Sequence, residues 1–364
     1  MSTFFKDLRV VELAGVLAGP AAGMFFAELG ARVVKIESRD GGDVTRAWKL
    51  EGEDPGAPVS AYFAAINYKK EYWSKDLRDE RDRAEVFAEL KDADVVLTSF
   101  APGRDVELGL DHASVAAINP DVIYARITGF GEDSPRHAFD VVLQAEAGFM
   151  SMNGTAESGP LKMPVALIDV LAAHHLKEAI LLALLKRERT GEGSYVGVSL
   201  YDAALTSLAN QATAYLMCAY VPQPLGTLHP CIAPYGEMFE TADGLRIVLA
   251  VGADRQFEAL CTVCGHPAWA EDERFATNPA RVKHRRELAE LLGNACGKLQ
   301  AEELGRRLEQ EGVPYGLVRS LDQVLAQDVA QRLIREETIQ GTLTRRLSSI
   351  AFGTAFLDRS PTAP

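Results

Sequence analysis

The chain has 364 residues, of which 51 are acidic and 38 basic, giving a formal net charge of −13. At about 150 residues per domain, this length indicates two to three domains and a core that needs no disulfide or metal to hold it. Hydrophobic residues at 47% and charged residues at 24% exclude a disordered or fibrous protein, and the acidic balance disfavours nucleic acid or an anionic membrane as the main partner.

The first third of the chain alternates short runs of β-branched residues with helical patterns, as the βαβ units of a parallel sheet do. The expected strands lie at 8–13, 32–37, 94–97 and 122–127. A glycine-rich turn connects the first strand to an expected helix at 21–29. We therefore predict an α/β fold with a doubly wound parallel sheet.

The apolar stretch at 14–29 does not have the pattern of a signal peptide. It follows Lys6 and Arg9, is interrupted by Gly19-Pro20, and runs into a charged strand. No apolar run is long enough to span a membrane. We expect a cytoplasmic protein that has no membrane partner.

The second half continues the large domain and then changes in composition. An apolar helix pattern at 164–187, a strand at 195–200 and a helix after Asp202 precede a stretch rich in Pro, Gly and His between 221 and 235. Further elements are expected at 246–251 and 315–318 as strands, and at 256–263, 285–299 and 301–310 as amphipathic helices. We predict a large domain over 1–220, completed by 330–364, and a linker with a small α+β domain over 221–329.

Five cysteines lie in the second half of the chain, at Cys218, Cys231, Cys261, Cys264 and Cys296. Their odd number does not form an even disulfide framework and fits a reducing cytosol. Cys261 and Cys264 form a CxxC, but they lie on one apolar face of an expected helix and no second pair follows. We predict no metal site.

The turn after the first strand carries Gly15, Gly19 and Gly23. This spacing is not the GxGxxG of a dinucleotide-binding turn, which disfavours a nicotinamide or flavin cofactor. The helix N-terminus that follows can still face an anion, such as a phosphate of another nucleotide. Arg39 comes just after the second strand, at the edge where open α/β sheets bind ligands.

Asp169 is the most informative single residue, because it is flanked on both sides by apolar residues. A carboxylate in such surroundings is costly to bury unless it is paired or capped. It is either the N-cap of a helix that begins at Val170, or a nucleophile or base with a shifted pKa, and both roles can hold together. Asp140, which follows His137 and Phe139, is an equally good N-cap candidate for the helix pattern after it.

Taken together, several segments resemble the class III CoA-transferases, a family that also contains the α-methylacyl-CoA racemases. The matching segments occur in order along nearly the whole chain. They are Val16-Leu17-Ala18-Gly19-Pro20, Leu29-Gly30-Ala31 with Val34-Lys35-Ile36-Glu37, Gly41-Gly42-Asp43, Phe100-Ala101-Pro102-Gly103, Asn119-Pro120 with Ile123-Tyr124, Ile127-Thr128-Gly129-Phe130-Gly131, Arg187-Glu188-Arg189-Thr190-Gly191-Glu192-Gly193, and Phe275-Ala276-Thr277-Asn278 with Arg281.

The resemblance implies a Rossmann-like large domain, a smaller C-terminal domain and an interlocked homodimer. It also implies that Asp169 is the catalytic aspartate. In the family's scheme this carboxylate attacks an acyl-CoA to give a mixed anhydride, then carries CoA as an aspartyl thioester until a carboxylic acid takes it over. Acyl-CoA and CoA are then substrates, with no permanently bound cofactor. Because water must be excluded, we expect a lid, for which the candidates are Gly226, Thr227, Leu228 and His229.

The resemblance also assigns a CoA pocket, in which some positions depart from the family's pattern. The residues expected near the thioester are His137, Phe139 and Asp140. The residues expected to bind CoA are Val16, Leu17, Ala18, Arg39, Lys75, Asp76, Leu77, Arg78, Ser99, Phe100 and Arg104. Ser38 stands where the family usually has a basic residue, and Glu107 stands where it usually has an arginine. Arg39 and Arg104 are adjacent cations that can compensate.

Two further departures bear on the substrate. Leu17 replaces the glutamine that is usual in the formyl and oxalate branch, and the 226–230 segment replaces that branch's polyglycine lid, so oxalate is not expected. Phe139 stands where the racemases have a histidine, which a racemase needs because inversion requires a base and an acid on opposite faces. We therefore expect a transferase; a 2-methylacyl-CoA racemase and an inactive CoA-binding homologue are the alternatives.

Overall fold

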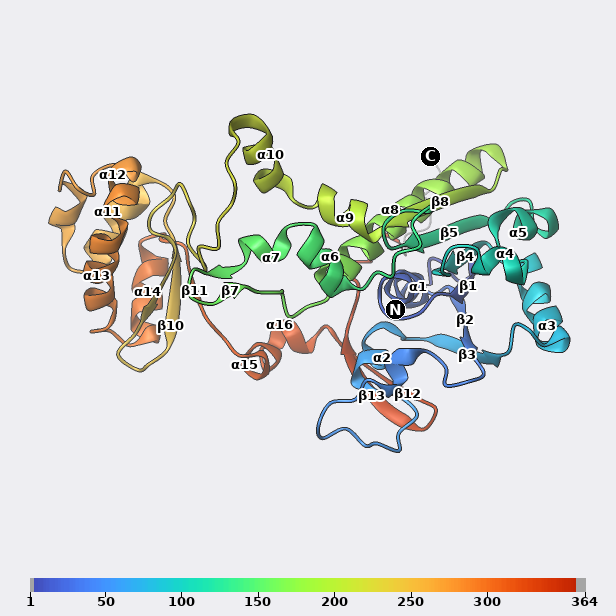
Figure 1. Ribbon diagram of the computed structural model, residues 1–364. Coiled ribbons are helices and arrows are strands. Elements are labelled where there is room, and N and C mark those ends of the chain that lie inside the picture. Colours follow the sequence, from blue (N-terminus) through green and yellow to red (C-terminus); the bar gives the residue numbers. More distant parts are fainter. Residues whose placement is uncertain (1–2, 358–364) are drawn as a thin grey trace, which may run out of the picture. The chain divides into compact units, whose positions relative to one another are not determined.

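The computed structural model describes residues 3–357, which form two compact units (Figure 1). The first unit comprises the described parts of Met1–Met150, Lys162–Val221 and Arg332–Pro364. The second comprises Ser151–Leu161 and Pro222–Gln331. The boundaries expected from the sequence differ from this division mainly at 151–161, which they place in the large domain.

The first unit is built on a six-stranded parallel sheet with the order β3-β2-β1-β4-β5-β8. Its strands are β1 (Arg9–Leu13), β2 (Arg32–Ser38), β3 (Lys70–Lys75), β4 (Val95–Thr98), β5 (Ile123–Thr128) and β8 (Ser194–Ser199). The strands expected from the sequence are all present, which confirms the parallel α/β fold. The charged edge strand β3 was not expected.

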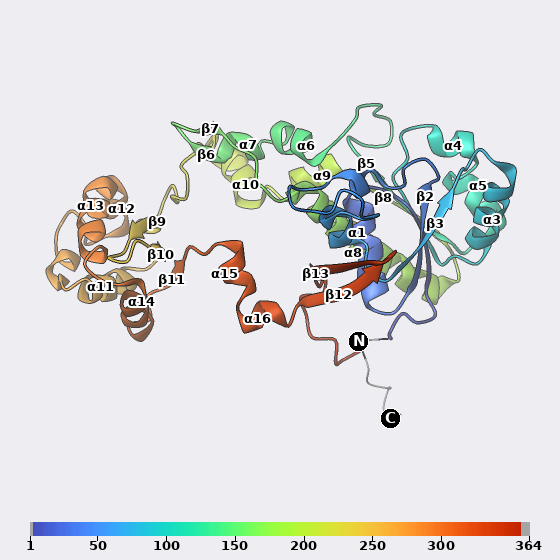
Figure 2. The same cartoon turned by 90° about the horizontal axis from the view of Figure 1, so that it is seen from below.

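Helices cover both faces of this sheet, as Figure 2 shows for α1 and α8 on one side of it and α3 and α5 on the other. One face carries α1 (Ala18–Glu28), α6 (Asp140–Glu146), α8 (Leu167–Thr190) and α9 (Leu200–Thr206), and the opposite face carries α3 (Glu80–Lys91), α4 (Arg104–Leu108) and α5 (His112–Ile118). Successive strand residues point to opposite faces, so Val10 packs against the first set and Val11 against the second.

A buried group of four charged side chains lies beside β1, β2 and β3. Glu12 accepts hydrogen bonds from Lys35 Nζ at 3.0 Å and from Lys70 Nζ at 3.0 Å, and Lys35 also pairs with Asp43 at 3.0 Å. None of the four side chains is more than 1% exposed. A Cβ at Gly23 would lie 2.1 Å from Glu12 Oε2, so only glycine lets α1 pass this carboxylate.

The C-terminal segment returns to the first unit as a hairpin of β12 (Ile334–Ile339) and β13 (Thr342–Leu347). Ile339 packs with Phe63 of α2 (Ala61–Ile66). Beyond the hairpin, Ser349 N donates to Glu28 Oε2 at 2.8 Å, and Arg346 pairs with the same buried carboxylate of α1. The end of the described chain is therefore fixed to its beginning. The other elements of this unit are η1 (Val44–Ala47) and α10 (Ala209–Cys218).

The second unit contains a three-stranded antiparallel sheet in the order β11-β10-β9, covered by helices. The strands are β9 (Tyr235–Glu240), β10 (Arg246–Ala250) and β11 (Tyr315–Leu317), and the helices are α11 (Asp254–Val263), η2 (Pro267–Ala270), α12 (Asn278–Lys283), α13 (Arg285–Cys296), α14 (Ala301–Gln310), α15 (Leu321–Leu325) and α16 (Asp328–Gln331). A short hairpin, β6 (Gly154–Thr155) with β7 (Gly159–Pro160), also belongs to it, and α7 (Phe149–Met152) spans the boundary.

Two residues singled out in the sequence have structural roles in the second unit. Cys261 is fully buried in its core on α11, in agreement with the apolar helix face expected around the CxxC. The guanidinium of Arg281 is also fully buried, where it donates to Ala233 O at 2.8 Å and to Phe275 O at 2.9 Å and pairs with Asp254. Within residues 3–357, no group of three or more His, Cys, Asp or Glu could hold a metal ion. None of the described helices is long and apolar enough to cross a bilayer.

Candidate active site

Two neighbouring cavities of the first unit open at the carboxyl ends of the parallel strands. The strand order reverses between β2-β1 and β4-β5, which is where open α/β sheets bind ligands. The cavities have volumes of about 340 and 280 Å³ and share Gly15 and Phe100 in their walls. We call them the basic cavity and the Asp169 cavity, after the side chains that distinguish them.

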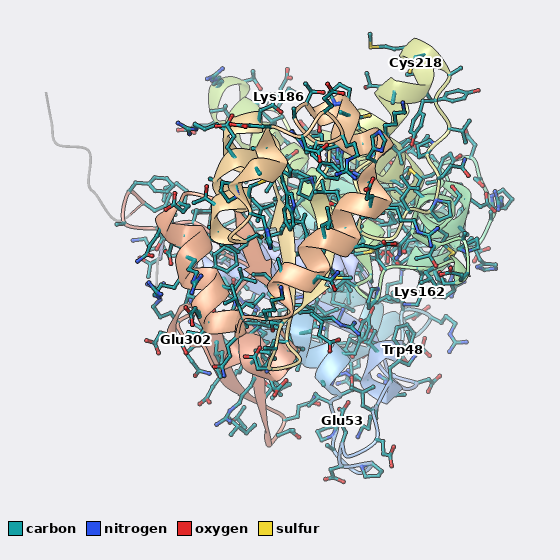
Figure 3. The ribbon with its side chains drawn as sticks, turned by 90° about the vertical axis from the view of Figure 1, so that its left-hand side faces the viewer. Trp48, Glu53, Lys162, Lys186, Cys218 and Glu302 are labelled. Carbon is teal, nitrogen blue, oxygen red and sulfur yellow. The ribbon has the colours of Figure 1, made fainter. Side chains whose placement is uncertain are left out.

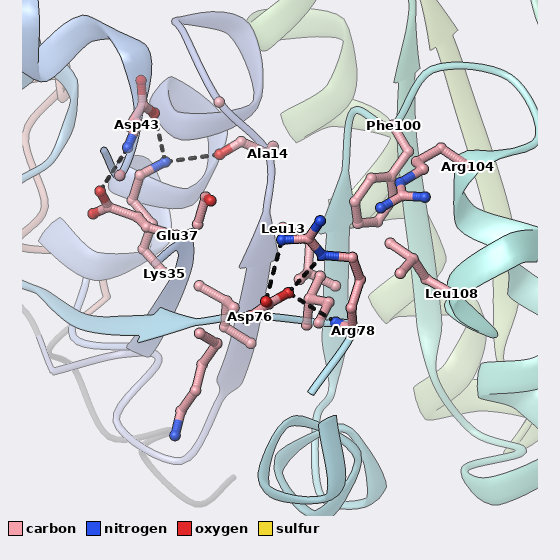
Figure 4. Close-up of a pocket in the computed structure, with 16 residues that line it drawn as sticks. Leu13, Ala14, Lys35, Glu37, Asp43, Asp76, Arg78, Phe100, Arg104 and Leu108 are labelled. Atoms are coloured by element: carbon pink, nitrogen blue, oxygen red, sulfur yellow. Dashed lines mark hydrogen bonds and ion pairs between the residues drawn. The ribbon is translucent and has the colours of Figure 1, made fainter. Parts of the chain in front are cut away.

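The basic cavity is lined by four cations, Lys35, Lys75, Arg78 and Arg104, and by three acids, Glu37, Asp43 and Asp76. Figure 4 shows Arg78 held by Asp76, through Nε and Oδ1 at 3.0 Å, with Arg104 beside Phe100. The hydrogen bond to Asp76 raises the pKa of Arg78. Because arginine and lysine prefer anions such as phosphate, this cavity can bind a polyanionic group against the net charge of the chain.

The departures from the family's pattern have direct structural consequences in this cavity. Arg104 Nη1 donates to Glu107 Oε2 at 2.7 Å, so Glu107 holds the arginine that lines the cavity. Arg39 pairs with Asp82 and is not among the residues that line the basic cavity, whereas Ser38 is. The cationic wall therefore consists of side chains that are each already paired with an acid.

The Asp169 cavity begins at the turn between β1 and α1. Val16 has a φ of 67°, which is strained for a β-branched residue and marks a backbone shaped for a particular geometry. No side chain caps α1 at Leu17. The first N–H groups of a helix have no partner within the helix, so they can meet a ligand here.

Asp169 lies in the first turn of α8 and is 8% exposed. The helix begins at Leu167 with Ala166 at the N-cap position, so the alternative in which Asp169 is the N-cap is wrong. Burial, and then the charge of Asp140, raise the pKa of Asp169 to about 7. No hydrogen bond reaches its carboxylate from the described residues, which leaves both oxygens available to react.

Asp140 caps a different helix from the one expected. It is the first residue of α6, whose N-cap is Phe139, and its Oδ1 accepts a hydrogen bond from Ile168 N of α8 at 2.7 Å. Because the first turn of α8 receives this capping bond from outside, Asp169 does not need to use its own carboxylate as a cap.

The structure brings most of the predicted site residues together, though in two groups. Lys75, Asp76, Leu77, Arg78, Phe100 and Arg104 line the basic cavity, and Val16, Leu17, Ala18, Ser99, Phe100, His137, Phe139 and Asp169 line the Asp169 cavity. Arg39 and Asp140 line neither cavity. The candidate lid residues Gly226, Thr227, Leu228 and His229 belong to the second unit, where Thr227 Oγ1 donates to Gly236 O at 2.6 Å.

Arg136 was missed in the sequence, although it lines the Asp169 cavity. Its guanidinium lies 3.9 Å from the centre of the Phe130 ring and pairs with Glu146. Among the residues that line the Asp169 cavity it is the only arginine or lysine. The signal in the sequence is its position, because Arg136 directly precedes His137, which was already expected near the thioester.

The site as a whole combines a reactive carboxylate with a place for anions. A buried aspartate whose pKa is near 7 can act as a nucleophile or as a base at neutral pH. An extended ligand with a phosphate end in the basic cavity could reach Asp169 through the wall that the two cavities share.

Known proteins resemble this chain over nearly its whole length. A family model described as CoA-transferase family III matches residues 5–362. A succinate–glutarate CoA-transferase of Agrobacterium fabrum is 39% identical over 332 residues, which are 90% of this chain and 82% of that protein. A succinyl-CoA:glutarate CoA-transferase of Mus musculus is 32% identical over 329 residues, 88% of this chain and 73% of that protein. The crystal structure of a CAIB/BAIF family protein from Brucella suis matches with a TM-score of 0.84 and 37% identity, covering 97% and 93% of the two chains.

Proposed function

The chain belongs to CoA-transferase family III, and on this basis we propose that it moves CoA from an acyl-CoA to a free carboxylic acid by covalent catalysis on Asp169. The observation that supports this most is the cavity that exposes Asp169, with a pKa near 7, next to a cavity lined by Lys75, Arg78 and Arg104. In this proposal the nucleotide phosphates of CoA bind in the basic cavity, and the pantetheine arm passes the shared wall at Gly15 and Phe100.

In the proposed reaction, a carboxylate oxygen of Asp169 acts as the nucleophile, and Cγ of Asp169 then acts as the acyl carbon that carries CoA. A carboxylate oxygen attacks the thioester carbon, the C–S bond breaks, and CoA thiolate leaves a mixed anhydride. The thiolate then attacks Cγ of Asp169, releasing the donor acid and leaving an aspartyl-CoA thioester. The acceptor carboxylate attacks Cγ and displaces the thiolate, which forms a new mixed anhydride. The thiolate then attacks the acyl carbon of the acceptor in this anhydride. The new acyl-CoA leaves, and the carboxylate of Asp169 is restored. Water must be excluded from each intermediate.

The exchange is tested by incubating the protein with succinyl-CoA and glutarate and measuring glutaryl-CoA by mass spectrometry. We expect glutaryl-CoA to form and succinate to be released in equal amounts. The reaction is also run in D₂O with 2-methylacyl-CoA. Deuterium at the α-carbon without transfer would identify a racemase, and CoA binding without either reaction would identify an inactive homologue.

The raised pKa of Asp169 predicts a pH dependence. Because the nucleophile is the ionised carboxylate, kcat/KM for the acyl-CoA should increase as the pH rises to about 7 and then level off. Asp140→Asn should move this limb to lower pH, since it removes the neighbouring charge while Asn can still accept the hydrogen bond from Ile168 N. Initial rates between pH 5 and 9 give the rising part of the pH profile for the wild type and for Asp140→Asn. Identical profiles in the two proteins would contradict a contribution of Asp140 to the pKa of Asp169.

We further propose that the acids exchanged are dicarboxylic, as in the names of the two relatives above. Arg136 supports this, because its guanidinium already engages the carboxylate of Glu146 through both Nη atoms and borders the Asp169 cavity. A second carboxylate on the acyl chain could take or share these donors. Guanidinium is well suited to carboxylate because it offers two parallel N–H groups.

Arg136→Leu is accordingly expected to lower kcat/KM for succinyl-CoA by about 10-fold to 100-fold, the range that loss of a charged hydrogen bond gives. Butyryl-CoA has the same chain length without the second carboxylate, and its kcat/KM should not fall. The exposed Arg189→Leu serves as the matched control. Equal losses for both donors would mean that Arg136 binds CoA itself and does not select the acid.

We also propose that the protein is a homodimer, in accordance with the resemblance. Apolar side chains are strongly exposed on α8 and α10, with Leu182 at 68%, Leu216 at 81% and Met217 at 82%. Figure 3 labels Cys218, the last residue of α10. Contiguous exposed apolar side chains mark interaction surfaces, and Leu216 and Met217 are adjacent on α10. Light scattering should give twice the chain mass, and Met217→Glu should increase the monomer fraction. A monomeric wild-type protein would contradict the proposal.

The compartment that we propose is the cytoplasm. All five cysteines are unpaired, and Cys218 and Cys231 are exposed. Exposed thiols of this kind persist in reducing surroundings.

A further inference from the structure

Gln144 of α6 is a polar side chain that the proposed chemistry does not use, although it is completely buried. Its Oε1 accepts a hydrogen bond from Met163 N at 2.8 Å. Its Nε2 donates to Asp140 Oδ2 at 2.7 Å and approaches Val165 O at 3.4 Å. One amide therefore links α6 to the segment that leads into α8.

Asp140 continues this connection to the residue next to the nucleophile. One of its oxygens accepts from Gln144, and the other accepts from Ile168 N, directly before Asp169. In the described part of the chain, no lysine, arginine or histidine forms an ion pair with Asp140. Two N–H donors, and no cation, thus hold this carboxylate.

The amide of glutamine is the side chain that these partners require. Gln144 must accept from one backbone N–H and donate to a carboxylate at the same time, and an amide has both an acceptor oxygen and a donor nitrogen. Methionine has a similar shape but offers neither a comparable donor nor a comparable acceptor. Glutamate can donate to Asp140 only when it is protonated.

We infer that Gln144 is a positioning residue for Asp169, acting through Asp140 and through the backbone of 163–168. Gln144 touches neither cavity, so its effect on the reaction is indirect. This inference rests on the proposed function only in assigning Asp169 as the nucleophile. A nucleophile that attacks a thioester must be held within a fraction of an ångström, because a misplacement of about 1 Å can slow a reaction about 100-fold.

Other titratable side chains near Asp169 also influence its ionisation. Burial, and then the charges of Asp169, Asp140 and Asp43, raise the pKa of Tyr62 on α2 to about 12. Arg136 and His137 border the same cavity. These groups are unchanged in the variants below, so a difference between variants reflects the amide at position 144.

The first test is Gln144→Met, with the exposed Gln310→Met as the matched control. We expect kcat of transfer to fall about 10-fold to 100-fold in Gln144→Met while KM for the acyl-CoA changes by less than about threefold, because ground-state binding is remote from the change. Amide hydrogen exchange of the peptide covering 163–169 should become faster in this variant alone. An unchanged kcat, or a loss equal to the loss of folded protein, would overturn the inference.

The second test is the pH dependence of Gln144→Glu. A protonated glutamic acid can replace both hydrogen bonds of the amide, whereas the ionised form repels Asp140. The ratio of kcat in Gln144→Glu to that of the wild type should therefore decrease as the pH rises, while the same ratio for Gln144→Met stays constant. Circular dichroism at each pH confirms that the protein is folded. A constant ratio for Gln144→Glu would overturn the inference.

The hydrogen-exchange measurement separates the two hypotheses. If the wild type transfers no CoA but Gln144→Met still loosens 163–169, the proposed function is wrong and the positioning contact stands. If the wild type transfers CoA and Gln144→Met neither loosens this segment nor lowers kcat, only the positioning role is wrong.

Discussion

Asp169→Asn is expected to abolish CoA transfer, by about 10³-fold or more, because an amide cannot replace the carboxylate as a nucleophile. Asn has the same shape, so binding of the acyl-CoA should persist with a similar Kd. Transfer is measured by mass spectrometry of the acyl-CoA products, and binding by calorimetry. The exposed Asp202→Asn, in the first turn of α9, is the matched control and should keep full activity.

The same substitution should change how stability depends on pH. The pKa of Asp169 in the folded protein, about 7, is above its ordinary value of 3.8, so ionisation weakens the folded state as the pH rises from about 4 through 7. Asp169→Asn removes this loss. Its Tm should equal that of the wild type near pH 4 and exceed it at pH 8.

Trapping identifies the covalent intermediate directly. With the wild type and an acyl-CoA, hydroxylamine should convert the aspartyl thioester to a hydroxamate on the peptide that contains Asp169. The Asn variant should remain unlabelled. A hydroxamate on any other carboxylate would show that Asp169 is not the nucleophile.

Glu12→Gln is expected to lower the free energy of unfolding by about 3–5 kcal/mol, because removing one partner of a buried ion pair usually costs this much. It would leave the buried Lys35 paired with Asp43 alone, and the buried Lys70 without an ion-pair partner among the residues that the structure describes. Desolvation already lowers the pKa of Lys70 to about 8. Urea unfolding, followed by circular dichroism, measures the change.

The control for this prediction is the exposed pair of Glu303 and Arg307 on α14. Surface pairs of this kind contribute about 0–1 kcal/mol, so Glu303→Gln should unfold at nearly the wild-type urea concentration. If Glu12→Gln is no more destabilising than Glu303→Gln, the four buried charges do not stabilise the first unit.

The central strands could be predicted because they are buried on both faces and therefore read as apolar runs. The edge strand β3, with the sequence Lys70-Glu71-Tyr72-Trp73-Ser74-Lys75, could not, because it has no such run. It is a strand because its residues pair with β2, with Val33 opposite Lys70 and Ser38 opposite Lys75. Lys70 in turn owes its place to Glu12, which is distant in sequence. Tertiary contacts decide this element.

The candidate site was predictable to the extent that it depends on local sequence. The apolar residues around Asp169 indicated a carboxylate with unusual surroundings. That Asp140 caps α8 could not be read from the sequence, because the hydrogen bond joins residues 28 positions apart. The role of Gln144 was hidden in the same way, since an isolated glutamine in an apolar helix pattern gives no signal until its partners are known.

The anchoring of Glu28 by the C-terminal hairpin has a consequence for how the protein is made. On a ribosome the carboxylate of Glu28 emerges 318 residues before Arg346 does. Because synthesis proceeds at about 5–20 residues per second, about 15–60 s pass before Arg346 is available to pair with the carboxylate of Glu28. During that interval the whole second unit is synthesised. The α/β unit is therefore begun first and finished last, and a chain arrested before residue 346 would expose an incomplete core to chaperones and proteases.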